Sequence, residues 1–387
     1  MKKDQILKVG LVFDDSLDSN DGVAQQVKTI GKWLTDQGHH VSYLVGQTKM
    51  KRWEGSPVYS LAKNQKVSFN ANRLSVPLPV GKRRLRELVE LREFDVLHVQ
   101  MPHSPFLAQK IVNMADTKTA VVGTFHIYPA SRLVSVGASF LKLTYGKGLK
   151  RFDEIISVSP AAASFAQKAF GIRSIILPNV IDIGRFKIKI KNIQKKKAPS
   201  VVFLGRLVER KGCRLLIEAF AILHKDCPDA RLTILGDGPQ RKDLEKLTIK
   251  KGIAEVVEFK GFIDEADKPS YLAAADIACF PSIGGESFGI VLIEAMAAGA
   301  GVVVGGDNPG YRSVLGDRME LLVDPKDPQL FAKRLKKLLE NIQLARELHE
   351  WQKDQVRRYD VSVVGPKIIS LYERAIAKRN KKVHNLN

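Results

Sequence analysis

The chain has 387 residues, of which 44% are hydrophobic and 27% are charged, a composition typical of a globular protein with two domains. No apolar run reaches the roughly 18 residues needed to span a bilayer, and three cysteines, an odd number without metal-type spacing, argue against a disulfide framework. The 62 Lys and Arg residues exceed the 41 Asp and Glu residues, and the resulting net charge of +21 indicates an anionic partner.

The amino-terminal half alternates short β-branched runs with helical patterns. Strands are expected at 8–13, 40–46, 95–100, 119–125, 154–159 and 174–179, and a helix at 23–36. Strands separated by helices predict a parallel, doubly wound sheet. The chain passes directly from a short basic leader into a strand, so we expect no signal peptide and a cytoplasmic location.

A lysine-rich segment of low apolar content at 187–197 predicts a linker, after which the pattern restarts. Strands are expected at 200–205, 231–236, 256–261, 276–280, 301–305 and 320–324, and helices at 212–225, 239–251, 288–298, 328–340, 343–357 and 362–377. This repetition predicts two Rossmann-like α/β domains facing an interdomain cleft. The expected boundaries are 1–186 for the first domain, 187–199 for the linker, 200–361 for the second domain, and 362–387 for a C-terminal helix and basic tail.

The stretch GGESFGIVLIEAMAAGA at 284–300 follows a strand and leads through a Gly-rich loop into a helix that is expected to begin near Phe288. The free amides of Ser287, Phe288 and Gly289 then point outward with the positive end of the helix dipole, which attracts phosphate. Glu286 precedes the helix, and Glu294 lies roughly 12 Å further along at about 1.5 Å per residue.

That separation matches a diphosphate with a sugar at each end. The geometry therefore suggests a nucleotide sugar, with Glu286 accepting hydrogen bonds from the transferred sugar and Glu294 from the ribose hydroxyls. The alternative is that Glu286 is an ordinary helix cap and Glu294 a buried salt-bridge partner. The spacing alone leaves both interpretations open.

The same stretch resembles the E-x7-E segment of the retaining GT-B glycosyltransferases of family GT4, and most of all the phosphatidylinositol mannosyltransferases of actinobacteria. The resemblance extends over most of the chain. It implies the GT-B fold, with a C-terminal helix that crosses back to the first domain. In VVFLGRLVERKG it implies that Arg206 and Lys211 grip the nucleotide diphosphate and stabilise it as it leaves; the alternative is a solvated basic loop.

Other segments carry further implied roles. VVGTFH resembles the strand that ends in the family's active-site histidine, which makes His126 the candidate beside the reacting sugar carbon, although a lone histidine at a strand end is more often structural. GFIDEADK resembles the segment that contacts the base, with Ile263 supplying backbone contacts and Glu265 and Lys268 available to guanine. Acidic loop residues are usually just solvated, so this match is the weaker one.

The first loop departs from the family pattern. Two glycines usually follow the first strand, whereas here Asp21 stands in the first position and only Gly22 remains to let the backbone approach the donor. Asp21 either brings an anion near the diphosphate or turns outward to cap the helix at Val23. Asp18 matches an acidic residue of that loop and is the candidate, with His126, for contact with the acceptor.

The resemblance implies a front-face reaction through an oxocarbenium-like state, in which Arg206, Lys211 and the helix start offset the negative charge growing on the diphosphate. No D-x-D motif or histidine cluster predicts a metal site. We expect no tightly bound cofactor, with Mg²⁺ as a stimulant at most.

The segment GKRRLRELVELR at 81–92 predicts a basic amphipathic helix with Lys82, Arg83, Arg84 and Arg86 on its charged side. Such a helix suits an anionic membrane surface, although it can equally be a solvated helix that packs its leucines on its own sheet. The resembling family uses a basic helix here to reach lipid. Neither this cluster nor the one at 187–197 carries interleaved aromatic residues, which disfavours nucleic acid.

The sequence therefore predicts a retaining hexosyltransferase that moves mannose from GDP-mannose to a lipid acceptor such as phosphatidylinositol, as a peripheral protein at the inner face of the cell membrane. One alternative is a UDP-sugar-dependent glucosyl- or galactosyltransferase acting on diacylglycerol or on a polyprenyl-linked or soluble glycan. A second, which Asp21 suggests, is a non-catalytic protein that binds a nucleotide sugar or anionic lipid.

Overall fold

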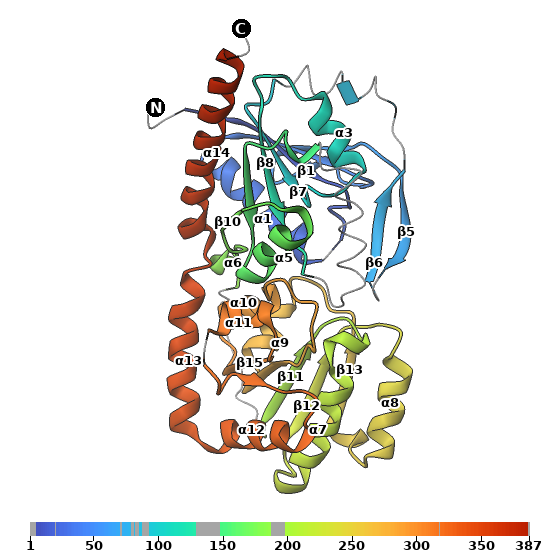
Figure 1. The fold of residues 1–387 in the computed structure, drawn as a ribbon. Coiled ribbons are helices and arrows are strands. Elements are labelled where there is room, and N and C mark those ends of the chain that lie inside the picture. Colours follow the sequence, from blue (N-terminus) through green and yellow to red (C-terminus); the bar gives the residue numbers. More distant parts are fainter. Residues whose placement is uncertain are drawn as a thin grey trace. The chain divides into compact units, whose positions relative to one another are not determined.

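The computed structural model describes residues 5–19, 21–69, 72–78, 81, 85–86, 93–128, 148–186, 198–316 and 318–385. The chain divides into unit 1, formed by Met1–Val180 and Val361–Asn387, and unit 2, formed by Ile181–Asp360. Each unit is built on a parallel α/β sheet of its own (Figure 1). The domain boundaries expected from the sequence stay a proposal, because residues 187–197 of the linker lie outside the described residues.

The sheet of unit 1 has eight strands in the order β10-β9-β8-β7-β1-β2-β4-β3. Their bounds are β1 Lys8–Phe13, β2 His40–Val45, β3 Arg52–Trp53, β4 Ser56–Ser60, β7 Val96–Gln100, β8 Ala120–Phe125, β9 Glu154–Ser157 and β10 Ile175–Ile176. All neighbours pair in parallel except β3 and β4. A separate antiparallel hairpin joins β5 (Asn64–Phe69) to β6 (Asn72–Pro77). The strand order reverses between β1 and β7, and ligands bind at such a switch point in open α/β sheets.

Helices cover both faces of this sheet. One hydrophobic core joins it to α1 (Gly22–Asp36) and α14 (Val361–His384), and the other joins it to α3 (Leu107–Met114) and α5 (Pro160–Phe170). The sequence explains the ends of α5, since Ser159 caps it, a proline follows in the first turn, and Gly171 ends it with φ 70°.

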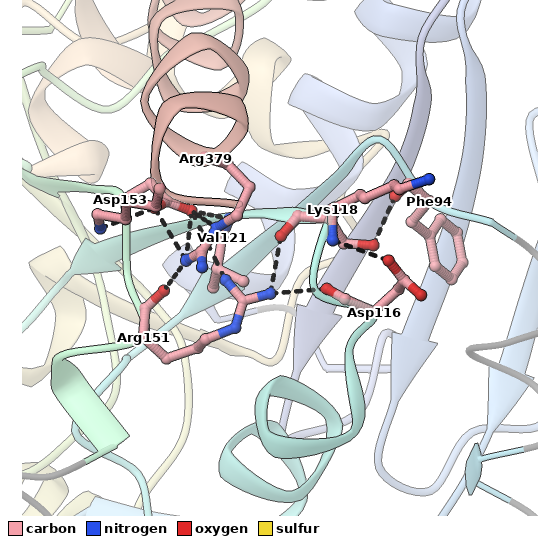
Figure 2. Close-up of polar contacts among 9 residues, drawn as sticks. Phe94, Asp116, Lys118, Val121, Arg151, Asp153 and Arg379 are labelled. Atoms are coloured by element: carbon pink, nitrogen blue, oxygen red, sulfur yellow. Dashed lines mark hydrogen bonds and ion pairs between the residues drawn. The ribbon is translucent and has the colours of Figure 1, made fainter. Parts of the chain in front are cut away.

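Ion pairs to a buried carboxylate join the C-terminal helix α14 to the rest of unit 1. Figure 2 shows Arg379 of α14 facing Asp153, which directly precedes β9, with Arg379 Nη2 2.9 Å from Asp153 Oδ1. The carboxylate of Asp153 is fully buried, and it also accepts a 3.0 Å hydrogen bond from the amide of Val121. Arg151 donates to the carbonyls of Asp116 and Thr119 beside this pair. The predicted return of the C-terminal helix to the first domain is therefore confirmed.

The sheet of unit 2 has the order β13-β12-β11-β14-β15-β16 and is parallel throughout. Its strands are β11 Ser200–Leu204, β12 Arg231–Leu235, β13 Val257–Gly261, β14 Ile277–Phe280, β15 Val302–Gly306 and β16 Leu322–Val323. This is the strand order of the dinucleotide-binding fold, whose switch point falls between its first and fourth strands, here β11 and β14. The carboxyl ends of β11 and β14 are therefore where a ligand site is expected.

The helices of unit 2 form two groups by their contacts. The first group packs around α7, and the second packs around α10. The first contains α7 Cys213–Asp226, α8 Arg241–Lys250 and α12 Pro328–Glu340; the second contains α9 Lys268–Ala273, α10 Ile290–Ala297, α11 Pro309–Leu315 and α13 Ile342–Arg357. The short helix α6 (Ile183–Phe186) also contacts α10.

The differences from the sequence expectations are local. Helix α10 begins at Ile290, two residues later than predicted, because Gly289 has φ 125° and ends the loop instead of starting the helix. Helix α14 extends to His384, seven residues past the predicted end at 377. Strands β3 to β6 were not predicted. In the described residues, no helix is long and apolar enough to cross a membrane.

Candidate functional site

Two loops of unit 2 are joined at the switch point of the sheet. The loop after β11 carries a 3-10 turn, Glu209–Lys211, and the loop after β14 runs from Pro281 to Gly289. The amide of Ile283 donates to the carbonyl of Arg210 at 2.9 Å. At Gly212, with φ 72°, a Cβ would lie 2.0 Å from the carbonyl oxygen of Pro281, so only glycine allows this approach.

Glu286 lies in the second loop and is held by two cations from the first loop and by a serine of its own loop. Arg210 Nη1 and Lys211 Nζ each lie 2.8 Å from Glu286 Oε1, and Ser282 Oγ donates to the same oxygen at 2.8 Å. Burial alone would raise the pKa of Glu286, but the charges of Lys211 and Arg210 outweigh it and hold the pKa below its usual value. Glu286 is thus a partly buried, ionised carboxylate, with its side chain 13% exposed, and not a helix cap.

Arg206 lies in the same loop as Lys211. It is half-buried, and within the described part of the chain its guanidinium makes no hydrogen bond or ion pair. A guanidinium without a protein partner, in the loop that also supplies Arg210 and Lys211, leaves positive charge available to an anion. The neighbouring start of α10 contributes the half-buried Ser287 and the buried Phe288 and Gly289.

Glu294 lies inside α10 and is 8% exposed. Burial raises its pKa to about 7, with Lys268 lowering it and Glu265 raising it. In the described residues this carboxyl group makes no hydrogen bond and no ion pair. It is therefore not the buried salt-bridge partner that the sequence left as an alternative. A buried carboxyl group without a partner is costly unless a ligand supplies hydrogen bonds.

The segment after β13 holds the predicted base contacts. Lys268, the first residue of α9, forms an ion pair with Glu265, and both belong to the charged surroundings of Glu294. Ile263 is half-buried between Phe262, which is 66% exposed, and Asp264. Glu265, Lys268 and Glu294 therefore lie close to one another in unit 2.

In unit 1, His126 follows β8 and is 8% exposed. Its Nε2 lies 2.7 Å from Oε1 of Gln100, the last residue of the adjacent strand β7. Burial, and then the proximity of His98 and His103, lowers the pKa of His126 to about 3, so it is neutral at physiological pH. A neutral imidazole can accept or donate a hydrogen bond but carries no charge to a substrate.

Two further buried histidines surround this position. His98 is bonded to Thr124 Oγ1 at 2.7 Å and to the hydroxyl of Tyr372 in α14 at 2.8 Å, and burial lowers its pKa to about 4. His103 stacks on Phe125 with ring centroids 5.3 Å apart, and burial lowers its pKa to about 4 as well. The carboxyl ends of β7 and β8 thus form a buried, neutral polar cluster.

The loop after β1 resolves the question that Asp21 raises. Its carboxylate caps α1 by accepting from the amides of Val23 and Ala24, both at 2.9 Å, and Gly22 is the first residue of the helix. Asp18 accepts from Thr48 Oγ1 at 2.9 Å and from the amide of Lys49 at 3.0 Å. Both carboxylates therefore already hold the loop in shape.

Of the predicted membrane-facing residues, Lys82, Arg83 and Arg84 lie outside the described residues. Arg86 is exposed and helical, and Leu85 beside it is fully buried in the core that contains α3 and α5. Packing of Leu85 in this core is what a solvated helix lying on its own sheet requires. The same packing is compatible with a basic outer face that meets a membrane.

Sequence reasoning missed Arg210, Ser282 and Gln100. Arg210 directly precedes Lys211 in a basic loop, but nothing in the sequence says that both reach one carboxylate. Ser282 and Gln100 are ordinary polar residues at strand ends. The only sequence signal for them is that they lie at the ends of strands next to predicted site residues. Among the residues that the structure describes, no group of three or more His, Cys, Asp or Glu side chains is arranged to hold a metal ion.

Comparisons with protein families agree with this division of the chain. Residues 184–355 match the family described as Glycosyl transferases group 1, and residues 20–185 match Glycosyltransferase Family 4. The chain is 32% identical over 375 residues to a phosphatidyl-myo-inositol mannosyltransferase of Mycolicibacterium smegmatis, covering 95% of this chain and 94% of the relative. It is also 32% identical to the Mycobacterium tuberculosis protein of that name, with 95% and 97% covered.

Solved structures share the fold at lower identity. A glycosyltransferase from Rickettsia africae superposes with a TM-score of 0.76 at 16% identity, covering 95% of this chain and 99% of that one. HepE of Anabaena, solved with UDP and glucose, gives a TM-score of 0.72 at 19% identity, with 95% and 99% covered. These similarities confirm the predicted GT-B fold class.

Proposed function

We propose that this chain, which belongs to glycosyltransferase family 4 and is a retaining glycosyltransferase, transfers mannose from GDP-mannose to a lipid acceptor such as phosphatidylinositol at the cytoplasmic face of the membrane. The relatives at 32% identity are named for mannose transfer to phosphatidylinositol, and a further relative at 25% identity is named as GDP-mannose-dependent. Their names support mannose as the sugar and a phosphoinositide as the acceptor.

The observation that carries the proposal is the contrast between the two carboxyl groups at α10. Glu286 is ionised and keeps Oε2 available, whereas Glu294 is buried without a hydrogen-bond partner in the described residues. A sugar hydroxyl donating to Glu286 and ribose hydroxyls donating to Glu294 satisfy both groups. A nucleotide sugar supplies hydroxyls on both sides of a diphosphate.

In this proposal the cations of unit 2 bind the diphosphate. Arg206 and Lys211 contact its oxygens, and the amides of Ser287, Phe288 and Gly289 add the partial positive charge of the helix start. Ile263, Glu265 and Lys268 contact the guanine. As the bond between the sugar C1 and the phosphate oxygen breaks, these groups stabilise the negative charge that develops on the leaving diphosphate.

Unit 1 contributes the neutral groups of the reaction. His126 accepts or donates a hydrogen bond to the transferred sugar, and Gly22 lets the backbone approach the donor. The acceptor oxygen forms the new bond to C1 on the face that the diphosphate leaves, and this preserves the anomeric configuration. The proton of the acceptor hydroxyl passes to the departing phosphate oxygen. Asp18 accepts a hydrogen bond from an acceptor hydroxyl, in addition to the two that it accepts from Thr48 and Lys49. The basic segment at 82–86 binds the anionic lipid surface.

The experiment is incubation of the full chain with labelled GDP-mannose, UDP-glucose or UDP-galactose and vesicles containing phosphatidylinositol, with mass analysis of the lipid product. The proposal expects mannosylated phosphatidylinositol from GDP-mannose only, and its loss in the Lys211→Met variant. A product from UDP-glucose alone would favour the glucosyl- or galactosyltransferase alternative. Nucleotide or lipid binding without turnover of any donor would favour a binding protein and contradict the proposal.

A further inference from the structure

The carboxylate of Glu286 receives more donors from the protein than orientation alone requires. Arg210, Lys211 and Ser282 all donate to Oε1 at 2.8 Å, and in the described part of the chain no group donates to Oε2. One oxygen is therefore saturated by protein groups, while the other keeps its accepting capacity. The carboxylate is held in one orientation before any ligand binds.

Two cations on one carboxylate matter when a second anion arrives. A diphosphate that draws the ammonium of Lys211 toward itself removes part of the charge that keeps Glu286 ionised. If Lys211 were the only cation there, this shift would leave a partly buried carboxylate without a compensating charge, which is unfavourable. Arg210 supplies the second cation, and its bond to Oε1 does not depend on Lys211.

Arg210 is fixed by the loop that carries Glu286. Its carbonyl accepts from the amide of Ile283 at 2.9 Å, which ties the 3-10 turn to the second loop at this residue. Behind them lies the buried Tyr311 of α11, whose pKa is raised by burial and by the charge of Glu286. A Cβ on Gly310 would lie 2.1 Å from the carbonyl oxygen of Glu286, so α11 packs directly on that backbone.

We propose that Arg210 is a positioning residue that keeps Glu286 ionised and oriented while Lys211 moves from that carboxylate to the diphosphate of the donor. The roles of Lys211 and Glu286 in this inference rest on the proposed function. Arg210 acts through Glu286 and does not itself bind the phosphates. The groups that face Glu286 are Arg210 and Lys211 from the 3-10 turn, Ser282 from the second loop and Tyr311 from α11.

The test measures protons that are taken up when GDP or UDP binds, by calorimetry of the full chain in buffers of different ionisation enthalpy. In wild-type protein Arg210 keeps Glu286 ionised, so binding leaves this carboxyl group unchanged. In Arg210→Met, departure of Lys211 leaves the partly buried carboxylate without a compensating charge, so its pKa rises and we expect it to take up as much as one additional proton per nucleotide. Arg210→Lys retains the charge and should behave as wild type.

Two controls isolate the cause. Arg214→Met removes one charge from an exposed position on α7 and should leave proton uptake unchanged. The double variant Arg210→Met/Glu286→Gln removes the group that titrates and should abolish the additional uptake. Equal uptake in Arg210→Met and wild type would overturn the inference, and so would uptake that persists in the double variant.

Kinetics give a second, separate readout. In Arg210→Met we expect kcat to fall about 10- to 100-fold, with the acid limb of its pH profile moved to higher pH, because a carboxyl group that has taken up a proton no longer presents its charge to the transferred sugar. GDP affinity should fall as well, and by less as the pH is lowered, since proton uptake and binding are linked. A loss of GDP affinity that is the same at every pH would make Arg210 a phosphate ligand and contradict the inference. Wild-type protein that transfers no sugar would sink the proposed function, while the proton measurement still decides the role of Arg210.

Discussion

The two units carry their charge clusters at opposite ends of their sheets. In unit 1, Asp153 and Arg379 meet beside the amino ends of β8 and β9, where they join α14 to the sheet (Figure 2). In unit 2, Arg210, Lys211 and Glu286 meet at the carboxyl ends of β11 and β14. Ligands of open α/β sheets bind at carboxyl ends, so we interpret the first cluster as structural and the second as ligand-binding.

The carboxyl ends of unit 1 have a different character. Gln100, His98, His103 and His126 lie there, and burial keeps the three histidines neutral. We infer a division of roles in which the cations of unit 2 bind a diphosphate and unit 1 provides uncharged hydrogen-bonding groups. The following variants test this division, in order of the expected change in free energy.

The largest expected effect removes the charge of the structural cluster. Asp153→Asn leaves Arg379 and Arg151 without their buried counter-charge, and we expect a loss of about 3 to 5 kcal/mol in the free energy of unfolding, measured in urea. The activity of each folded molecule should not change. Glu93→Gln, which breaks an exposed pair with Lys8, should change the stability by less than about 1 kcal/mol. If the two variants lowered the free energy of unfolding by similar amounts, the Asp153 cluster would not be the structural one.

The next effect concerns the ligand-binding cluster. Lys211→Met should lower kcat/KM by about 100- to 1000-fold, equivalent to about 3 to 4 kcal/mol, because a cation is lost where charge develops. Steady-state kinetics with GDP-mannose measures this, with Arg214→Met as the charge-matched control. A loss of less than tenfold would mean that Lys211 only pairs with Glu286.

Replacing Glu286 or Glu294 by glutamine should change the stability of the ligand-free protein in opposite directions. The pKa of Glu294 is raised from 4.5 to about 7, so the folded state is progressively penalised as pH rises from 4.5 to 7. Glu294→Gln should therefore stabilise the ligand-free protein by up to about 3 kcal/mol at pH 8 and by nothing at pH 4.5, while weakening nucleotide binding. Glu286→Gln should destabilise it, since two cations lose their partner.

Thermal and urea unfolding at both pH values measure the pair. Stabilisation by Glu294→Gln without any loss of nucleotide affinity would contradict a ligand role for this residue. Equal responses at pH 4.5 and 8 would show that the charge of Glu294 is not what the substitution removes.

The buried histidines of unit 1 predict a loss of stability in acid. His103 has a folded pKa of about 4 against 6.5 when unfolded, so the stability it permits is complete above pH 6.5 and is lost as pH falls toward 4. His103→Phe keeps the stacking on Phe125 and removes the titration. It should stabilise unit 1 by about 2 kcal/mol at pH 5 relative to its effect at pH 7.5. An effect independent of pH would show that His103 is not held neutral by burial.

The smallest effect concerns the capping residue of α1. Asp21→Ala should cost about 1 kcal/mol, because two amides at the start of the helix lose their acceptor, whereas Asp21→Asn should keep most of the stability. Urea unfolding compares the two variants. If Ala and Asn gave equal stability, the side chain of Asp21 would be free for another role.

The sequence predicts the two parallel sheets well because the β-branched runs and their spacing are local signals. It does not predict strands β3 to β6, since Arg52–Trp53 is only two residues long and the hairpin Asn64–Pro77 lacks a strong turn pair. The start of α10 was misplaced by two residues, because the local sequence does not show that Gly289 has φ 125° or that a Cβ there would lie within 3.0 Å of Tyr311 and Leu292.

For the candidate site, the sequence indicates which loops to examine but not how their side chains pair. Glu286 and Lys211 follow from the motif, whereas the sharing of one carboxylate oxygen by Arg210, Lys211 and Ser282 needs three dimensions. Asp21 shows the reverse case. Its unusual position suggested a changed active site, and its carboxylate is a helix cap.

The central claim is that unit 2 recognises a diphosphate, and the affinities of GDP, GMP and guanosine test it most directly. Calorimetry of the wild type and of Arg206→Met/Lys211→Met should show GDP binding much more tightly than GMP in the first protein and nearly equally in the second. The double variant should leave guanosine binding unchanged. Equal affinities for GDP and GMP in the wild type would contradict the account.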